Sequence, residues 1–114
     1  MNWIDLNSSE QLEGVIDMSF KQAVVIFKHS TRCSISLMAK SRLERQTSNE
    51  QSLDFYYLDL LNYRPISDLI ASKFDVQHES PQILLIQNGE CIYHCSHGSI
   101  DFNDLEQYLK LPQS

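Results

Sequence analysis

The spacing of apolar residues along the chain changes between two periods. Residues 23–27 and 54–59 are short apolar runs rich in β-branched or aromatic side chains, which predicts two buried strands. Before, between and after these runs, apolar residues recur every three or four positions, the period of a helix face. The pattern therefore predicts alternating helices and strands over the first two thirds of the chain.

Four segments show the helical spacing. The first covers residues 8–19, where Ser8 and Gln11 are placed as a capping box, and another has Pro65 in its first turn. Ser99 or Asp101 is placed to cap the last helix. The predicted buried faces are Leu12, Val15, Ile16 and Phe20; Ile35, Met38, Ala39 and Leu43; Ile66, Leu69, Ile70 and Phe74; and Phe102, Leu105, Tyr108 and Leu109.

The last two strands are predicted to form a hairpin. Residues 82–87 and 90–95 flank Asn88-Gly89, a strong signal for a two-residue turn, so these strands are antiparallel. Strands connected through helices must instead run parallel. The expected fold class is α/β, with a mixed four-stranded sheet flanked by helices and a possible fifth strand at Trp3-Ile4, in a single domain over residues 1–114.

Composition narrows the choice of partners. The chain has 114 residues, a net charge of -6 and scattered basic residues, so neither nucleic acid nor an anionic membrane is an expected partner. The N-terminus lacks the basic and apolar regions of a signal peptide, and we expect a cytoplasmic protein. Three widely spaced cysteines argue against a secreted disulfide framework and for reduced thiols.

Cys33 lies where the first apolar run gives way to a predicted helix. Unpaired N–H groups and the helix dipole stabilise an anion there, which favours the thiolate and makes Cys33 a good leaving group from a mixed disulfide. Ser36 stands where a resolving cysteine would complete a C-x-x-C motif, so Cys33 has no local partner. Ser36 is expected either to face solvent or to donate a hydrogen bond to the Cys33 sulfur.

Three blocks of sequence resemble a known family. Residues 28–36, residues 78–82 and Ser96-His97 are similar to the signature blocks of the YtxJ-like monothiol bacilliredoxins, and the order of elements is that of the thioredoxin-like fold. The resemblance covers nearly the whole chain. It implies that Cys33 takes bacillithiol, or a similar low-molecular-weight thiol, from S-thiolated client proteins.

The resemblance also implies further site residues. Pro81 is expected to follow a cis peptide bond, and the backbone of Ser80 to pair with an extended substrate. Ser34 stands where many family members have proline, which is expected to alter loop stiffness and redox potential. The low-molecular-weight thiol is a co-substrate, no tightly bound cofactor or metal is implied, and a monomer or weak dimer is expected.

Other residues near Cys33 allow alternative roles. One of Ser30 and Thr31 is expected to cap the helix, while the other, together with Arg32, could contact carboxylates of the bound thiol, since bacillithiol carries a malate group. His29 could orient or deprotonate the thiol, and His78 and His97 could flank the cleft. A hydrogen-bonded structural role is the alternative for each histidine.

Cys91 and Cys95 are four residues apart on one predicted strand. The period of a strand places both on the same face and His94 on the other. Packed or half-exposed spare thiols are favoured over a resolving role, and a metal site with His94 and His97 is disfavoured because residues on opposite faces converge on one ion only across a bulge.

Two other classes of function remain open. Monothiol glutaredoxin-like domains can carry an iron-sulfur cluster, but their C-G-F-S loop differs from this chain at Ser34 and Ile35. A non-catalytic thioredoxin-like module for stress or protein interaction is the third possibility.

Overall fold

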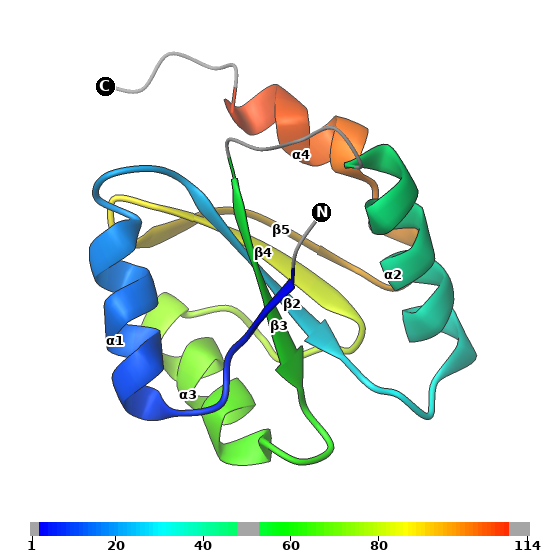
Figure 1. The fold of residues 1–114 in the computed structure, drawn as a ribbon, viewed down its shortest axis with the longest axis horizontal. Coiled ribbons are helices and arrows are strands. Elements are labelled where there is room, and N and C mark those ends of the chain that lie inside the picture. The colour runs from blue at the N-terminus through cyan, green and yellow to red at the C-terminus, as the bar shows by residue number, and fades with distance from the viewer. Residues whose placement is uncertain (1–2, 48–52, 110–114) are drawn as a thin grey trace.

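A computed structural model describes residues 3–47 and 53–109 (Figure 1). In these residues five strands and four α-helices follow one another, with a short 3-10 helix, η1, before the last helix. In chain order they are β1 (Trp3–Asp5), α1 (Ser9–Met18), β2 (Val24–His29), α2 (Ser34–Gln46), β3 (Asp54–Asp59), α3 (Arg64–Phe74), β4 (Gln82–Gln87), β5 (Glu90–Ser96), η1 (His97–Ser99) and α4 (Phe102–Leu109).

The strands form one mixed sheet in the order β1-β3-β2-β4-β5. β1 and β2 both pair with β3 in parallel, whereas β4 runs antiparallel to β2 and to β5. The predicted α/β class, the mixed sheet and the fifth strand at the N-terminus are therefore confirmed.

Helices cover both faces of the sheet. α1 and α3 lie on one face, and α2 and α4 lie on the other (Figure 1). Each face of the sheet has its own hydrophobic core, and alternate residues of the central strand β2 point into one or the other. Val24 and Ile26 pack in the core under α1 and α3, while Val25 and Phe27 pack in the core under α2 and α4. Ala39 and Leu43 of α2 thus pack on the same apolar layer as Val25 and Phe27.

The helix starts follow local chemistry. Ser8 Oγ accepts a hydrogen bond from Gln11 N at 3.1 Å, and Gln11 Oε1 accepts from Asn7 N, one residue earlier than the predicted capping box requires. At α4 the cap is Asp101, whose Oδ1 accepts from Asn103 N at 2.8 Å. Both helices are thus fixed by side chains of adjacent residues.

The predicted buried faces are wrong at four positions. Phe20 lies beyond the end of α1 and is 61% exposed. Ile35 and Met38 are 49% and 63% exposed, because α2 turns Ala39 and Leu43, rather than these two residues, into the core. Tyr108 is also exposed, although its ring packs against the ring of Tyr93 in β5.

A β-bulge changes the register of β5. Tyr93 pairs with Leu85 and Cys91 pairs with Ile86, so one extra residue, Ile92, lies between them. As a result Cys91 packs against the core on the α1 and α3 side, and Cys95 packs against the opposite core. The prediction that both thiols share one face is wrong.

No helix in residues 3–47 and 53–109 is long and apolar enough to span a membrane.

Candidate active site

Cys33 occupies the N-cap position of α2. Its backbone is extended, with φ -107° and ψ 120°, and its carbonyl oxygen accepts the first helical hydrogen bond from Leu37 N at 3.0 Å. The prediction that Ser30 or Thr31 caps this helix is therefore wrong. The thiol is half-buried, and no hydrogen bond to its sulfur is present within the described part of the chain. It lies beside the unpaired N–H groups of the first turn.

Ser36 is fully buried behind the cysteine. Its Oγ accepts a hydrogen bond from Ser30 N at 3.1 Å and shares another with His29 Nδ1 at 2.6 Å. Both predicted alternatives for Ser36 are wrong, since it faces neither solvent nor the sulfur. It joins the first turn of α2 to the loop that follows β2.

His29 contacts Ser36, which in turn is hydrogen-bonded to the loop that follows β2. Its ring lies between Phe27 and Tyr57, with centroid distances of 5.4 and 5.3 Å. Burial, followed by the charge of nearby Lys40, lowers the pKa of His29, which keeps the imidazole neutral at pH 7. These contacts connect the His29 side chain to Ser36 in the first turn of α2 and to two aromatic rings of the sheet.

The side chains next to the cysteine are open to solvent. Thr31 and Arg32, directly before Cys33 in the chain, and Ser34, directly after it, are all exposed.

The loop before β4 contains a cis peptide bond between Ser80 and Pro81, the isomer that the family resemblance implies. Pro81 O accepts a hydrogen bond from His97 N at 2.9 Å, and Glu79 contacts Ser96 Oγ through its carboxylate. Ser80 Oγ is buried and lacks a hydrogen-bond partner among the described residues. This loop, called here the cis-proline loop (residues 77–81), is therefore tied directly to the start of η1.

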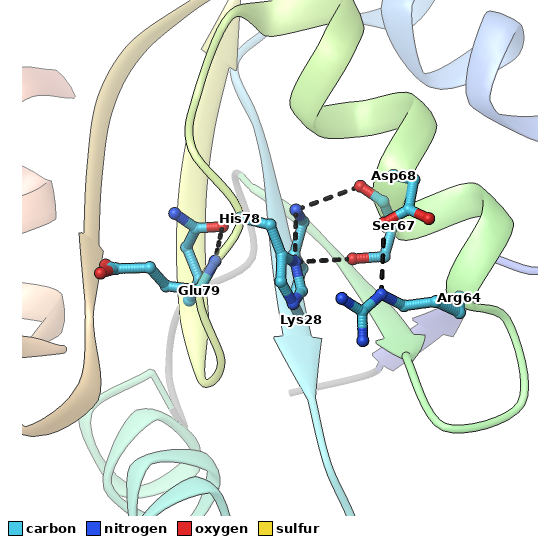
Figure 2. Close-up of polar contacts among 7 residues, drawn as sticks. Lys28, Arg64, Ser67, Asp68, His78 and Glu79 are labelled. Carbon is cyan, nitrogen blue, oxygen red and sulfur yellow. Dashed lines mark hydrogen bonds and ion pairs between the residues drawn. The ribbon is translucent and has the colours of Figure 1, made fainter.

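A buried lysine lies under the same loop (Figure 2). Lys28 is 0% exposed; its Nζ donates to Ser67 O at 3.2 Å and lies 3.4 Å from His78 Nδ1. Burial lowers the pKa of Lys28 to about 8, although the charge of Asp68 opposes the shift. The lysine thus links β2, α3 and the cis-proline loop.

His78 completes this cluster. Its Nδ1 also lies 3.1 Å from Ser67 Oγ, so the lysine and the serine converge on one ring nitrogen. Burial and then the nearby Lys28 charge lower the pKa of His78. A neutral imidazole can accept at this nitrogen, which fits the donor Lys28.

Lys28 was missed by sequence reasoning, which ended the strand at residue 27. The available signal was a lysine directly after four apolar residues of a buried strand, one position before His29. Its partners are 39 and 50 residues away, and no local pattern reveals them.

Cys91 and Cys95 have the properties of packed thiols. Burial raises the pKa of Cys91 to about 11, and its Sγ donates to Tyr93 O at 3.3 Å. Burial also raises the pKa of Cys95. All three cysteines are free, and the described residues contain no cluster of three or more side chains that could hold a metal ion.

Solved structures with the same architecture support this description of the fold. The chain is similar to a protein provisionally described as an oxidoreductase with a thioredoxin fold, with 37% identity, 95% of this chain and 94% of that chain covered, and a TM-score of 0.84. Thioredoxins of Malassezia sympodialis and Trypanosoma brucei brucei align with TM-scores of 0.74 and 0.76 over 95% and 96% of this chain and 88% of each of those chains. Their identities, 18% and 17%, show the shared fold alone.

The sheet order, the cysteine at the start of α2 and the cis-proline loop define a thioredoxin-fold oxidoreductase. Within that class, a family model for the monothiol bacilliredoxin BrxC matches residues 4–105. The chain belongs to the monothiol bacilliredoxin family, as the three sequence blocks predict.

Proposed function

We propose that this protein removes a low-molecular-weight thiol, bacillithiol or a close relative, from mixed disulfides on client proteins through Cys33 alone. The observation that carries the proposal is the pairing of a half-exposed Cys33 at the N-cap of α2 with a fully buried Ser36 at the resolving position. Because α2 offers no second thiol, the mixed disulfide that forms on Cys33 would be resolved by an incoming thiol.

The reaction has two balanced steps. The Cys33 thiolate attacks the bacillithiol sulfur of the client mixed disulfide; the S–S bond to the client breaks, and the client thiolate leaves with the electron pair and takes a proton from water. A second bacillithiol, as its thiolate, then attacks the bacillithiol sulfur held on Cys33. Bacillithiol disulfide forms, and Cys33 leaves as a thiolate.

The site has groups suited to hold an extended client. Ser80 precedes the cis bond, and its backbone would pair with an extended substrate strand, as in β-strand addition. The exposed Thr31, Arg32 and Ser34 would contact the same substrate. His29 and Ser36 would hold the cysteine loop in position from behind.

The proposal also specifies the molecular setting. S-thiolated proteins are the partners, the low-molecular-weight thiol is a co-substrate rather than a bound cofactor, and the protein works as a monomer or weak dimer in a reducing compartment such as the cytoplasm. Neither nucleic acid nor membrane takes part.

The test is catalytic turnover on a bacillithiolated client protein with excess free bacillithiol. Wild type is expected to release client thiol over many cycles, Cys33→Ser to release none, and Cys91→Ser and Cys95→Ser to retain wild-type rates. Turnover that survives Cys33→Ser would overturn the proposal. Purification of a brown, cluster-bearing protein that has no exchange activity would also overturn it.

A further inference from the structure

A groove between α2 and η1 begins two residues after Cys33. It has a volume of about 210 Å³ and is lined by Ile35, Met38, Ala39, Arg42, His97 and Gly98. The size is below the roughly 300–1,000 Å³ of pockets that enclose a whole drug-sized ligand. The groove therefore suits one end of a small molecule rather than all of it.

The apolar wall of the groove consists of side chains that do not fill the core. Ile35 and Met38 are 49% and 63% exposed, although their spacing predicts burial. Large apolar side chains that are exposed together along one groove are typical of a binding surface. They can cover the carbon skeleton of a ligand attached to Cys33.

Arg42 gives the groove its charge. The lining contains no Asp or Glu, in a chain whose net charge is -6, so the groove favours an anionic ligand. Arg42 Nη1 donates to Ile100 O at 2.8 Å, which fixes the guanidinium beside the groove. This bond uses one of the five N–H donors of arginine, and the planar group suits a carboxylate.

His97 joins the groove to the cis-proline loop. Its φ of +56° is in the left-handed region, and its backbone N donates to Pro81 O at 2.9 Å. His97 and Gly98 of η1 line the groove opposite the α2 residues. The η1 wall of the groove is thus hydrogen-bonded to the cis-proline loop, and the other wall is formed by α2 from Ile35 onward.

We infer that this α2–η1 groove binds the carboxylate-bearing end of the low-molecular-weight thiol while its sulfur is bonded to Cys33, with Arg42 as the carboxylate ligand. The inference rests on the proposed function and specifies how the thiol is selected. A thiol without a carboxylate gains nothing from Arg42, so the site distinguishes thiols by their acidic groups. The covalent steps are those given above.

The experiment compares two mixed disulfides on the same client cysteine, one with bacillithiol and one with cysteamine, which has no carboxylate. Single-turnover rates are measured for wild type, Arg42→Gln and Arg42→Lys. Arg42→Gln is expected to slow bacillithiol removal about 10-fold and cysteamine removal less than about 2-fold, because a charge-assisted hydrogen bond is lost only with the first. Arg42→Lys should restore part of the difference.

Arg45→Gln is the matched control, since Arg45 lies one turn further along α2 and outside the groove but gives the same change in net charge. It should leave both rates unchanged. The ratio of the two rates is read within each protein, so a partial loss of folding from the broken Ile100 contact cancels.

The outcomes separate the two proposals. Equal slowing of both substrates by Arg42→Gln, or a selectivity loss in Arg32→Gln but not in Arg42→Gln, would overturn the groove assignment and leave the exchange function standing. Failure of wild type to act on either mixed disulfide would overturn the proposed function itself.

Discussion

Lys28 Nζ lies 3.4 Å from His78 Nδ1, and the lysine is fully buried. Two basic side chains therefore lie next to each other, and Ser67 of α3 contacts both of them (Figure 2). A protonated lysine can donate to a neutral imidazole, whereas two cations there would repel each other. The contact fixes the cis-proline loop to β2, the strand that leads to Cys33.

Because Lys28 is buried, the free energy of unfolding is expected to vary with pH in the alkaline range. Its pKa falls from 10.5 to about 8 on folding, so between these values the unfolded chain holds a proton that the folded chain has lost. Linkage then requires the free energy of unfolding to rise with pH from about 8 to 10.5, and to lose that gain as the pH falls through 8. The size over the full window is about 3 kcal/mol.

Lys28→Met is expected to abolish this rise. Urea unfolding of both proteins at pH 7.5 and pH 10 gives the difference in stability, in which the other titrating groups cancel. The free energy of unfolding of the wild type, relative to that of the variant, should increase with pH. A difference that stays constant with pH would show that Lys28 is not desolvated.

Ser36→Ala should destabilise the protein by about 1–3 kcal/mol, because Ser30 N–H and His29 Nδ1 both lose a hydrogen-bond partner in a buried setting. Ser34→Ala is the control two positions away, where the side chain is exposed, and should change stability by less than about 0.5 kcal/mol. Chemical denaturation measures both. Equal effects would contradict the positioning role of Ser36.

The three cysteines should differ in their rates of alkylation. With a pKa of about 11, Cys91 is thiolate in only about one molecule in a thousand at pH 8. Iodoacetamide with peptide mapping should therefore label Cys33 first and Cys91 last. Since Cys91 and Cys95 pack on opposite faces of the sheet, mild oxidation should form no disulfide between them. Early labelling of Cys91 would contradict its burial.

Two glycines should respond to alanine in opposite ways. Gly89 has φ +77° in the hairpin turn, and an added Cβ would lie 2.8 Å from Phe20 Cζ, so Gly89→Ala should cost about 1–2 kcal/mol. Gly14 is inside α1 with open space around it, so Gly14→Ala should gain about 0.5–1 kcal/mol. Thermal melts distinguish the two, and a loss at Gly14 would contradict the helix assignment.

The fold could be predicted because its signals are local. Strand runs, helical spacing and the Asn88-Gly89 turn each occupy a few neighbouring residues, and connection rules then fix the sheet. The bulge in β5 escaped prediction because it depends on pairing with β4, and it reversed the face of Cys91.

The candidate site was predicted in part. Cys33 was identified from its place between a strand and a helix, and the cis bond before Pro81 from the family resemblance. The partner of Ser36 and the exposure of Met38 depend instead on how α2 meets the rest of the fold. Arg42 was not singled out, because its place beside the groove depends on η1, more than 50 residues later in the chain.

The most direct test of the central claim is the intact mass of the protein after it reacts with an equimolar bacillithiolated client. One bacillithiol adduct, mapped to Cys33 and matched by one released client thiol, is the expected result, and the Cys33→Ser variant should stay unmodified. An adduct on Cys91 or Cys95, or an unmodified wild type beside an intact client, would contradict the claim that Cys33 alone carries the exchange.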